Sequence, residues 1–219
     1  ASAAALLVAG ISAALVKVSK TGEGQVIDAS IAESANYLTT YAKSFYQSGH
    51  LSDARGASWL DGAAPWNTTY QTQDGQYMVV AAIEAKFYCA LIAALGLNAD
   101  PLFADLDQWD YGRWPEQKDV MERRFGSESR AFWAQVFDGL DACVSPVLNY
   151  KESANHPQFI ARDALWSSDG QIFPVPAPRF SVTPSLTSPP ELTDDLHDYL
   201  RAMGVADSAL AAWRLDEQA

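Results

Sequence analysis

The clearest hydrophobic and polar pattern lies between residues 60 and 97. Two segments rich in Thr, Tyr and Val, residues 67–72 and 76–83, flank an Asp-Gly pair at Asp74 and Gly75. Gly supplies the positive backbone angle that a tight turn needs, so the pattern predicts a β-hairpin. The second segment shows no polar alternation over most of its length, which is typical of a strand covered on both faces. We therefore predict that it lies centrally in its sheet.

A single carboxylate, Glu84, follows the second strand and begins a helix that is predicted to end at Leu97. The junction between the carboxyl end of a strand and a helix is where open α/β layers commonly hold their chemistry. However, an acidic residue in the first turn of a helix is also stabilised by the free N–H groups and the positive dipole end there. On the pattern alone, the structural interpretation of Glu84 is favoured over a functional one.

Residues 1–16 are apolar or small almost throughout and predict a helix. A membrane span needs about 20 such residues, and a secretory signal needs a basic start that this segment lacks, so we expect neither. A helix that is apolar on all sides is expected to be buried within a sizeable layer. We therefore expect that a further, N-terminal portion of the protein covers this helix.

The remaining pattern predicts shorter elements. Ser30 is placed to cap a helix, and Gly22 or Gly24 is placed to end the first one. Further helices are expected at residues 31–48, 115–125, 128–140, 149–166 with a break at Pro157, 192–203 and 207–215, and short strands at residues 25–28 and 142–147. Residues 98–114 are expected to form an irregular, solvated surface excursion, and the Pro-rich residues 170–188 an extended connection.

Composition excludes several classes of protein. With 48% hydrophobic residues among 219, the chain can bury a real core. Its 15 basic and 27 acidic residues give a net charge of −12, which argues against nucleic acid and an anionic membrane surface as partners. Cys89 and Cys143 lie in apolar segments without CxxC spacing, so we expect reduced, buried thiols and a cytoplasmic protein. His50, His156 and His197 have no ligand-spaced partners, so no metal site is expected.

Four motifs together resemble a known family. Residues 60–97 contain Leu-Asp-Gly, then Tyr-x-Thr-x-Asp-Gly, then the apolar strand closed by Ala-Ile-Glu at Glu84. Gly-x-Gly-Gln-x-x-Asp occupies residues 22–28, Asp-Ala-Cys-Val-Ser-Pro-Val residues 141–147, and Pro-Ala-Pro-Arg-Phe-Ser residues 176–181. Their order and spacing resemble the α-methylacyl-CoA racemases of the class III CoA-transferase superfamily. The resemblance extends over essentially the whole chain but only over the C-terminal portion of a family member.

This resemblance implies an α/β fold, namely the C-terminal part of a two-domain, interlocked-dimer class III CoA-transferase fold. On this basis the chain contains the end of a Rossmann-like large domain and a small α/β domain. The implied division is the end of the large domain at residues 1–49, a linker at 50–62, the small domain at 63–169, an extended return linker at 170–189 and C-terminal helices that pack on the large domain at 190–219.

The resemblance also implies a reaction, the inversion of the α-carbon of 2-methylacyl-CoA thioesters through an enolate. Such a reaction needs a base, an acid and stabilisation of the enolate oxygen. In the family a His and an Asp, both upstream of the position that matches Ala1, supply the acid and base. A third catalytic residue, the Glu of Ala-Ile-Glu, maps onto Glu84, and its implied role is to orient the catalytic His of the other subunit.

The implied site and partners follow from the same resemblance. Substrate-binding residues are expected at Leu60, Asp61, Ala64, Pro65, Trp66 and Ile83. Without the resemblance, the apolar residues among them would be simple core. No cofactor is expected other than coenzyme A as the carrier part of the substrate. Because the chain is short of Lys and Arg, the CoA pocket is expected mainly in the missing N-terminal portion. The expected partners are an acyl-CoA thioester, that portion and a second copy in an interlocked homodimer, without nucleic acid or membrane.

Two other functions remain open at this point. A class III CoA transferase would use an upstream Asp to form an acyl-aspartyl enzyme, and some transferases cover that intermediate with a run of glycines. Residues 61–66 contain one glycine, which favours the racemase. The third hypothesis is a non-catalytic fragment that only assembles with a partner.

Overall fold

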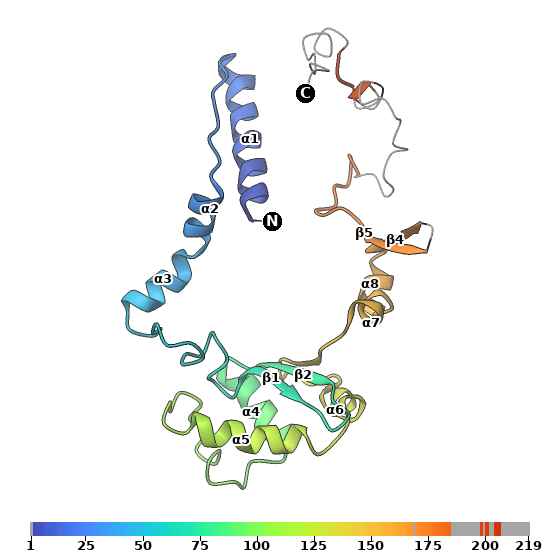
Figure 1. Ribbon diagram of the computed structural model, residues 1–219. Helices are drawn as coiled ribbons and strands as arrows, with labels where there is room; N and C mark the ends of the chain where they lie inside the picture. The colour runs from blue at the N-terminus through green and yellow to red at the C-terminus, as the bar shows by residue number, and fades with distance from the viewer. Residues whose placement is uncertain (1, 169, 185–197, 199, 202–203, 207–219) are drawn as a thin grey trace, which may run out of the picture. The chain divides into compact units, whose positions relative to one another are not determined.

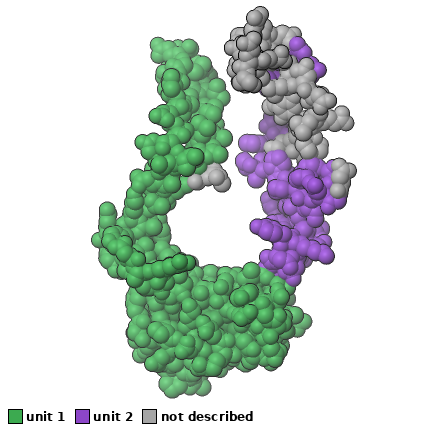
Figure 2. All heavy atoms as spheres, viewed as in Figure 1, with its two compact units in different colours: residues 1–147 green, residues 148–219 purple. Residues whose placement is uncertain are grey.

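The computed structural model describes residues 2–168, 170–184, 198, 200–201 and 204–206 (Figure 1). The chain divides into two compact units, residues 1–147 and residues 148–219 (Figure 2). This division does not coincide with the boundaries expected at residues 49, 62, 169 and 189. Those boundaries refer to a larger protein, so they stay a prediction.

The first unit contains a three-stranded antiparallel sheet in the order β1-β2-β3. Its strands are β1 (Asn67–Gln71), β2 (Tyr77–Ala81) and β3 (Val144–Pro146). Its helices are α1 (Ser2–Thr21), α2 (Ile31–Leu38), α3 (Thr40–Gln47), α4 (Ala85–Ala94), α5 (Trp114–Phe125) and α6 (Arg130–Phe137) (Figure 1). The predicted hairpin and the central position of its second strand are confirmed, and Gly75 takes the positive φ of 73° that the turn requires.

The expectation that both faces of β2 are covered is wrong for this chain. Met78 and Val80 are buried, whereas Tyr77 and Val79 are 45% and 37% exposed. Helix α5 contacts β1, and helix α6 contacts β2 and β3. The buried side chains of β2 belong to the same core cluster as buried side chains of α4, α5 and α6. An antiparallel sheet needs only one covered face, so an apolar strand sequence did not require two.

The core of the first unit is largely aromatic. The Phe125 ring stacks on Tyr70 at 4.9 Å between centroids and meets the edge of Trp133 at 5.2 Å. The predicted apolar stripe of residues 128–140 is confirmed for Trp133 and Phe137, while Phe132 is 41% exposed. The expectation of a solvated excursion at residues 98–114 is wrong for Phe103, which is fully buried, and for Gln108 and Trp114.

Helix α1 extends to Thr21 and ends at Gly22, whose φ of 74° confirms the predicted C-cap. The expected burial of this helix within a sizeable layer is not observed in this chain. Ala14 is buried, but the side chains of Val8 and Leu15 are more than 60% exposed. Residues 3–21 are long and apolar enough to cross a membrane, but the core helix of a soluble protein passes the same test of length and composition.

The helix predicted at residues 31–48 is broken at Thr39 into α2 and α3. Ser30 is its N-cap as predicted, since the hydroxyl oxygen accepts the amide of Glu33 at 3.3 Å. The strand expected at residues 25–28 is absent from the described structure, because this segment pairs with no strand there.

The second unit contains α7 (Tyr150–Ala154), α8 (Pro157–Ala161) and an antiparallel hairpin of β4 (Leu165–Ser168) and β5 (Gln171–Pro174). The break at Pro157 is confirmed. The hairpin takes the place of the end of the expected helix and of the first part of the expected extended connection. The rings of Trp166 and Phe173 stack across its two strands, with 4.6 Å between their centroids. The helices expected at residues 192–203 and 207–215 lie mostly outside the described residues.

Candidate active site

Glu84 lies at the N-cap of α4, directly after the central strand. Its backbone is extended, with φ −79° and ψ 144°, and its carbonyl oxygen accepts the amides of Phe87 and Tyr88 at 2.9 and 3.0 Å. The carboxylate itself makes no capping hydrogen bond and is exposed. Most N-cap carboxylates accept a backbone N–H of the first helical turn, so this helix does not use the Glu84 side chain as a cap.

Lys86 lies two residues after Glu84, and Asp141 and Cys143 lie in the segment that pairs with the end of β2. We call Glu84, Lys86, Asp141 and Cys143 the Glu84 edge. The Lys86 ammonium lies 3.9 Å from the Asp141 carboxylate and 4.3 Å from the centre of the Phe87 ring. Partial burial, then the charges of Asp141 and Glu84, raise the pKa of the Cys143 thiol, and Lys86 opposes them. The negative charge of Glu84 therefore contributes to the raised pKa of the Cys143 thiol.

The exposure and the backbone pairing of Cys143 place it near the end of β2. It is exposed and Cys89 is half-buried, so the expectation of buried thiols is wrong for Cys143, although both cysteines are free. Cys143 has a φ of 51°, and its carbonyl oxygen accepts the amide of Ala81 at 3.0 Å. Pairing with the end of β2 therefore places the thiol next to the strand end from which Glu84 projects.

Replacing Glu84 by Gln, or Asp141 by Asn, is expected to accelerate alkylation of Cys143 by iodoacetamide at pH 7 by about two- to threefold. Loss of either negative charge lowers the thiol pKa and increases the fraction of thiolate. The rate is measured by mass spectrometry of the peptide that contains Cys143, and Cys89 serves as the internal control. An unchanged rate in Glu84→Gln would show that the carboxylate points away from Cys143.

The segment that precedes Glu84 is held by hydrogen bonds from two directions. The amide of Ala82 donates to the carbonyl of Trp66 at 2.9 Å, and the side-chain Nε2 of Gln108 donates to the carbonyl of Ile83 at 2.6 Å. Gln108 is 3% exposed. Sequence reasoning missed this residue because it lies in residues 98–114, which were expected to be solvated. The local signal was a single glutamine within a segment rich in acidic and aromatic residues.

The residues expected to bind substrate fall into two groups. Leu60 and Ile83 are accessible, at 41% and 36% exposure, and Ile83 adjoins Glu84. Trp66, like Ala64 and Pro65, is buried. Trp66 donates its indole N–H to the carbonyl of Gln108 at 2.7 Å. These positions do not test substrate binding, which stays a prediction.

Asp61 has a local structural role in this chain. Its carboxylate accepts the amide of Ser58 at 2.7 Å and that of Gly56 at 2.8 Å. Partial burial raises the pKa of Asp61, but the hydrogen bonds from Ser58 and Gly56 outweigh it, so the pKa lies below its ordinary value. The carboxylate therefore fixes the loop before β1.

Described residues of the first unit line a pocket beside Gln108 and another along the hairpin. An apolar pocket of about 350 Å³ is lined by Phe45, His50, Trp59, Trp109 and Tyr111. The centroid of its Trp109 ring lies 4.7 Å from that of Trp66, and Trp109 follows Gln108 in the chain. This aromatic pocket therefore lies next to Gln108, whose side chain bonds the residue before Glu84.

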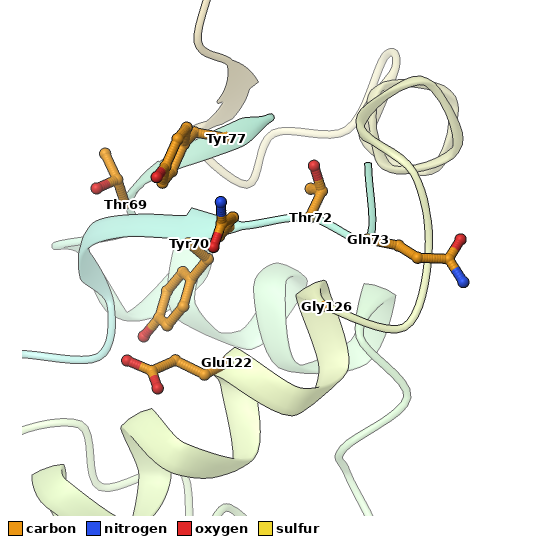
Figure 3. Close-up of a pocket in the computed structure, with 8 residues that line it drawn as sticks. Thr69, Tyr70, Thr72, Gln73, Tyr77, Glu122 and Gly126 are labelled. Carbon is orange, nitrogen blue, oxygen red and sulfur yellow. The ribbon is translucent and has the colours of Figure 1, made fainter. Parts of the chain in front are cut away.

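The second hollow, of about 610 Å³, is polar and lies along the hairpin (Figure 3). Figure 3 shows the Tyr70 hydroxyl and the Glu122 carboxylate pointing toward one another. Burial, and then the charge of Glu122, raise the pKa of Tyr70. Its lining includes residues 69–73, around the turn, whereas Glu84 follows the other end of β2, so this hollow is separate from the Glu84 edge.

Comparison with known proteins decides the family. The model of CoA-transferase family III matches residues 1–195. The chain belongs to CoA-transferase family III. This family membership confirms the resemblance that the four sequence motifs indicate.

Among curated members of the family, two racemases are similar to this chain. Alpha-methylacyl-CoA racemase of Mus musculus is 37% identical over 206 residues, which are 92% of this chain and 53% of the mouse protein. The Homo sapiens protein of the same name is 41% identical over 180 residues, 82% of this chain and 46% of the human protein. Acetyl-CoA:oxalate CoA-transferase of Acetobacter aceti is 27% identical over 170 residues, 75% of this chain and 42% of that protein. The chain spans about half the length of these relatives.

A solved structure shares the fold of this chain. The crystal structure of a CAIB/BAIF family protein from Brucella suis matches 90% of this chain and 52% of its own, with a TM-score of 0.68 and 22% sequence identity. The predicted mixed α/β fold of this family is therefore confirmed, and the match to about half of each relative is consistent with a C-terminal portion.

Proposed function

We propose that this chain is part of a racemase that inverts the α-carbon of 2-methylacyl-CoA thioesters by removing and returning a proton through an enolate. The observation that carries the proposal is the 37% and 41% identity to two alpha-methylacyl-CoA racemases, against 27% to a CoA-transferase. The exposed, uncapped carboxylate of Glu84 supports it, because this side chain is free to receive a partner.

In this proposal Glu84 orients an imidazole that the described chain does not supply. His50 lines the aromatic pocket, and the imidazole Nδ1 of His156 accepts the amide of Gln158 at the start of α8. His197 lies outside the described residues. A carboxylate that accepts a ring N–H fixes the tautomer and direction of the imidazole, so that its other nitrogen can remove or return a proton.

The proposal extends to the partners of the chain. The thioester would be held mainly by protein outside it, because coenzyme A carries phosphates and this chain has 15 basic against 27 acidic residues. Two copies of the complete protein would form an interlocked homodimer in the cytoplasm. In this scheme coenzyme A enters as part of the substrate, and no resident cofactor is needed for a proton transfer.

A CoA transferase is the second candidate, and the name of the matching family favours it. That reaction passes through an acyl-enzyme on an Asp, and it needs an acceptor carboxylic acid. Proton exchange at the α-carbon is not part of acyl transfer, so the two functions are distinguished by their products.

The complete gene product that contains this chain, incubated with (2R)-2-methylacyl-CoA in deuterium oxide, is expected to place deuterium at the α-carbon and to give both epimers. Mass spectrometry and chiral chromatography measure the two outcomes, and the thioester without protein is the control. Transfer of CoA to an added carboxylic acid, without α-exchange, would replace the racemase by the transferase. If neither reaction occurs, the chain is part of a protein that only assembles.

A further inference from the structure

We propose that Gln108 is a positioning residue, whose buried side-chain amide fixes the backbone from which Glu84 projects. This inference rests on the proposed function for its catalytic consequence, but its structural part can be tested separately. Within the described residues Gln108 makes no hydrogen bond to the Glu84 carboxylate, and it acts instead through the carbonyls of Ala82 and Ile83.

The amide is needed because the sheet ends just before Glu84. The pairing of β1 with β2 stops at Asn67 and Ala81, and the amide of Ala82 makes one more bond across, to the carbonyl of Trp66. Beyond that point the Gln108 Nε2 donates to the carbonyl of Ile83 at 2.6 Å and lies 3.4 Å from that of Ala82. One side-chain donor thus replaces the strand partner that the last residues before Glu84 no longer have.

The backbone of Gln108 is itself fixed by hydrogen bonds from two indoles. Its carbonyl oxygen accepts the indole N–H groups of Trp66 at 2.7 Å and of Trp114 at 2.9 Å, and both indoles are buried. Trp66 belongs to the segment before β1, and Trp114 begins α5. The position of Gln108 is therefore determined by two elements, and its side chain transmits that position to a third, the start of α4 at Glu84.

The chain offers a matched control in Gln117. This residue is 1% exposed, and its Nε2 donates to the carbonyl of Leu102 at 2.8 Å. It is thus a second buried glutamine amide bound to a backbone carbonyl, but in the part of the chain that the structure describes it makes no hydrogen bond to residues 82–84. Methionine approximates the shape of glutamine without its donor, so Gln108→Met and Gln117→Met remove the same group without opening a cavity.

The first experiment compares hydrogen exchange in Gln108→Met, Gln117→Met and the unaltered chain. Exchange of the backbone amides of residues 82–88 is expected to become about tenfold faster in Gln108→Met and to stay unchanged in Gln117→Met. The Gln108 carbonyl is retained, so the two indole bonds persist and the amides of β1 should keep their protection. Equal exchange of residues 82–88 in the two variants would overturn the proposal. If Gln108→Met fails to fold, Gln108→Asn, which keeps a neutral amide but withdraws its donor from the Ile83 carbonyl by one methylene, takes its place.

The second experiment measures α-proton exchange of 2-methylacyl-CoA by the complete gene product. Displacement of an orienting group by about 1 Å can lower a rate by about 100-fold, so kcat is expected to fall by about 10- to 100-fold in Gln108→Met while KM changes little. Gln117→Met should retain both values. A fall in kcat of the same size in both variants would show a general structural effect and overturn the positioning role. If the unaltered protein performs no α-exchange, the proposed function fails, and hydrogen exchange alone decides whether Gln108 positions Glu84.

Discussion

Replacing Glu84 by Gln is expected to lower α-proton exchange by the complete gene product by about 10- to 1000-fold. The amide keeps the shape of the side chain but loses its negative charge. It can no longer stabilise an imidazolium, and it can turn its NH₂ toward the ring N–H that the carboxylate would accept. The measurement is the rate of deuterium incorporation at the α-carbon of a 2-methylacyl-CoA in deuterium oxide.

The fold should survive this change, because the Glu84 carboxylate is exposed and makes no capping hydrogen bond. The urea midpoint of the variant should therefore match that of the unaltered protein. Asp141→Asn is the matched control, since it removes a carboxylate from the same edge that pairs with Lys86. The exchange rate of that variant is expected to change by less than about twofold. Unchanged exchange in Glu84→Gln would return this residue to an ordinary role at the start of a helix.

Local rules predicted the parts of the fold that depend on neighbouring residues. The Asp-Gly turn required a positive φ at Gly75, and Ser30 could accept an amide three residues later, so both sites were readable from the sequence. The break at Thr39 was not readable, because residues 31–48 keep a helical pattern through it. The hairpin of β4 and β5 was missed for a similar reason, since its cross-strand ring contact is not a periodic signal.

Properties that depend on distant contacts were not predictable in the same way. Phe103 and Gln108 are buried because they pack against elements far away in the sequence. The local composition, which is acidic and aromatic, carries no information on those contacts and suggested a solvated surface. Helix α1 shows the opposite case. Its sequence indicates a covered helix, yet Val8 and Leu15 are exposed in this chain.

The candidate site was predicted unevenly. Family resemblance, not periodicity, raised Glu84 above other acidic residues, and the structure then showed that its carboxylate is not used as a cap. The residues expected around it came from one continuous segment, and proximity in sequence did not decide exposure. Ile83 is accessible and Trp66 is not. The support of the site comes instead from Gln108, 25 residues from Ile83.

Replacing Trp66 by Ala is expected to destabilise the first unit by about 3 to 5 kcal/mol. Trp66 is fully buried, packs against the rings of Trp59, Trp109 and Trp114, and donates its indole N–H to the Gln108 carbonyl. Ala would remove these contacts and leave a cavity that the surrounding rings cannot fill. Urea unfolding of the chain, followed by far-ultraviolet circular dichroism, measures the change in the free energy of unfolding.

Two further variants separate this structural role from the substrate contact that the family resemblance implies. Trp66→Phe keeps an aromatic ring but loses the N–H. It should destabilise the chain by about 0.5 to 1.5 kcal/mol through the loss of one hydrogen bond, because the Gln108 carbonyl keeps its bond from the Trp114 indole. Trp109→Ala removes an indole that is 44% exposed, and it should therefore destabilise less than Trp66→Ala. If Trp66→Ala leaves the free energy of unfolding within about 1 kcal/mol of the unaltered chain while raising the KM for the thioester in the complete protein, Trp66 contacts substrate rather than supporting the core.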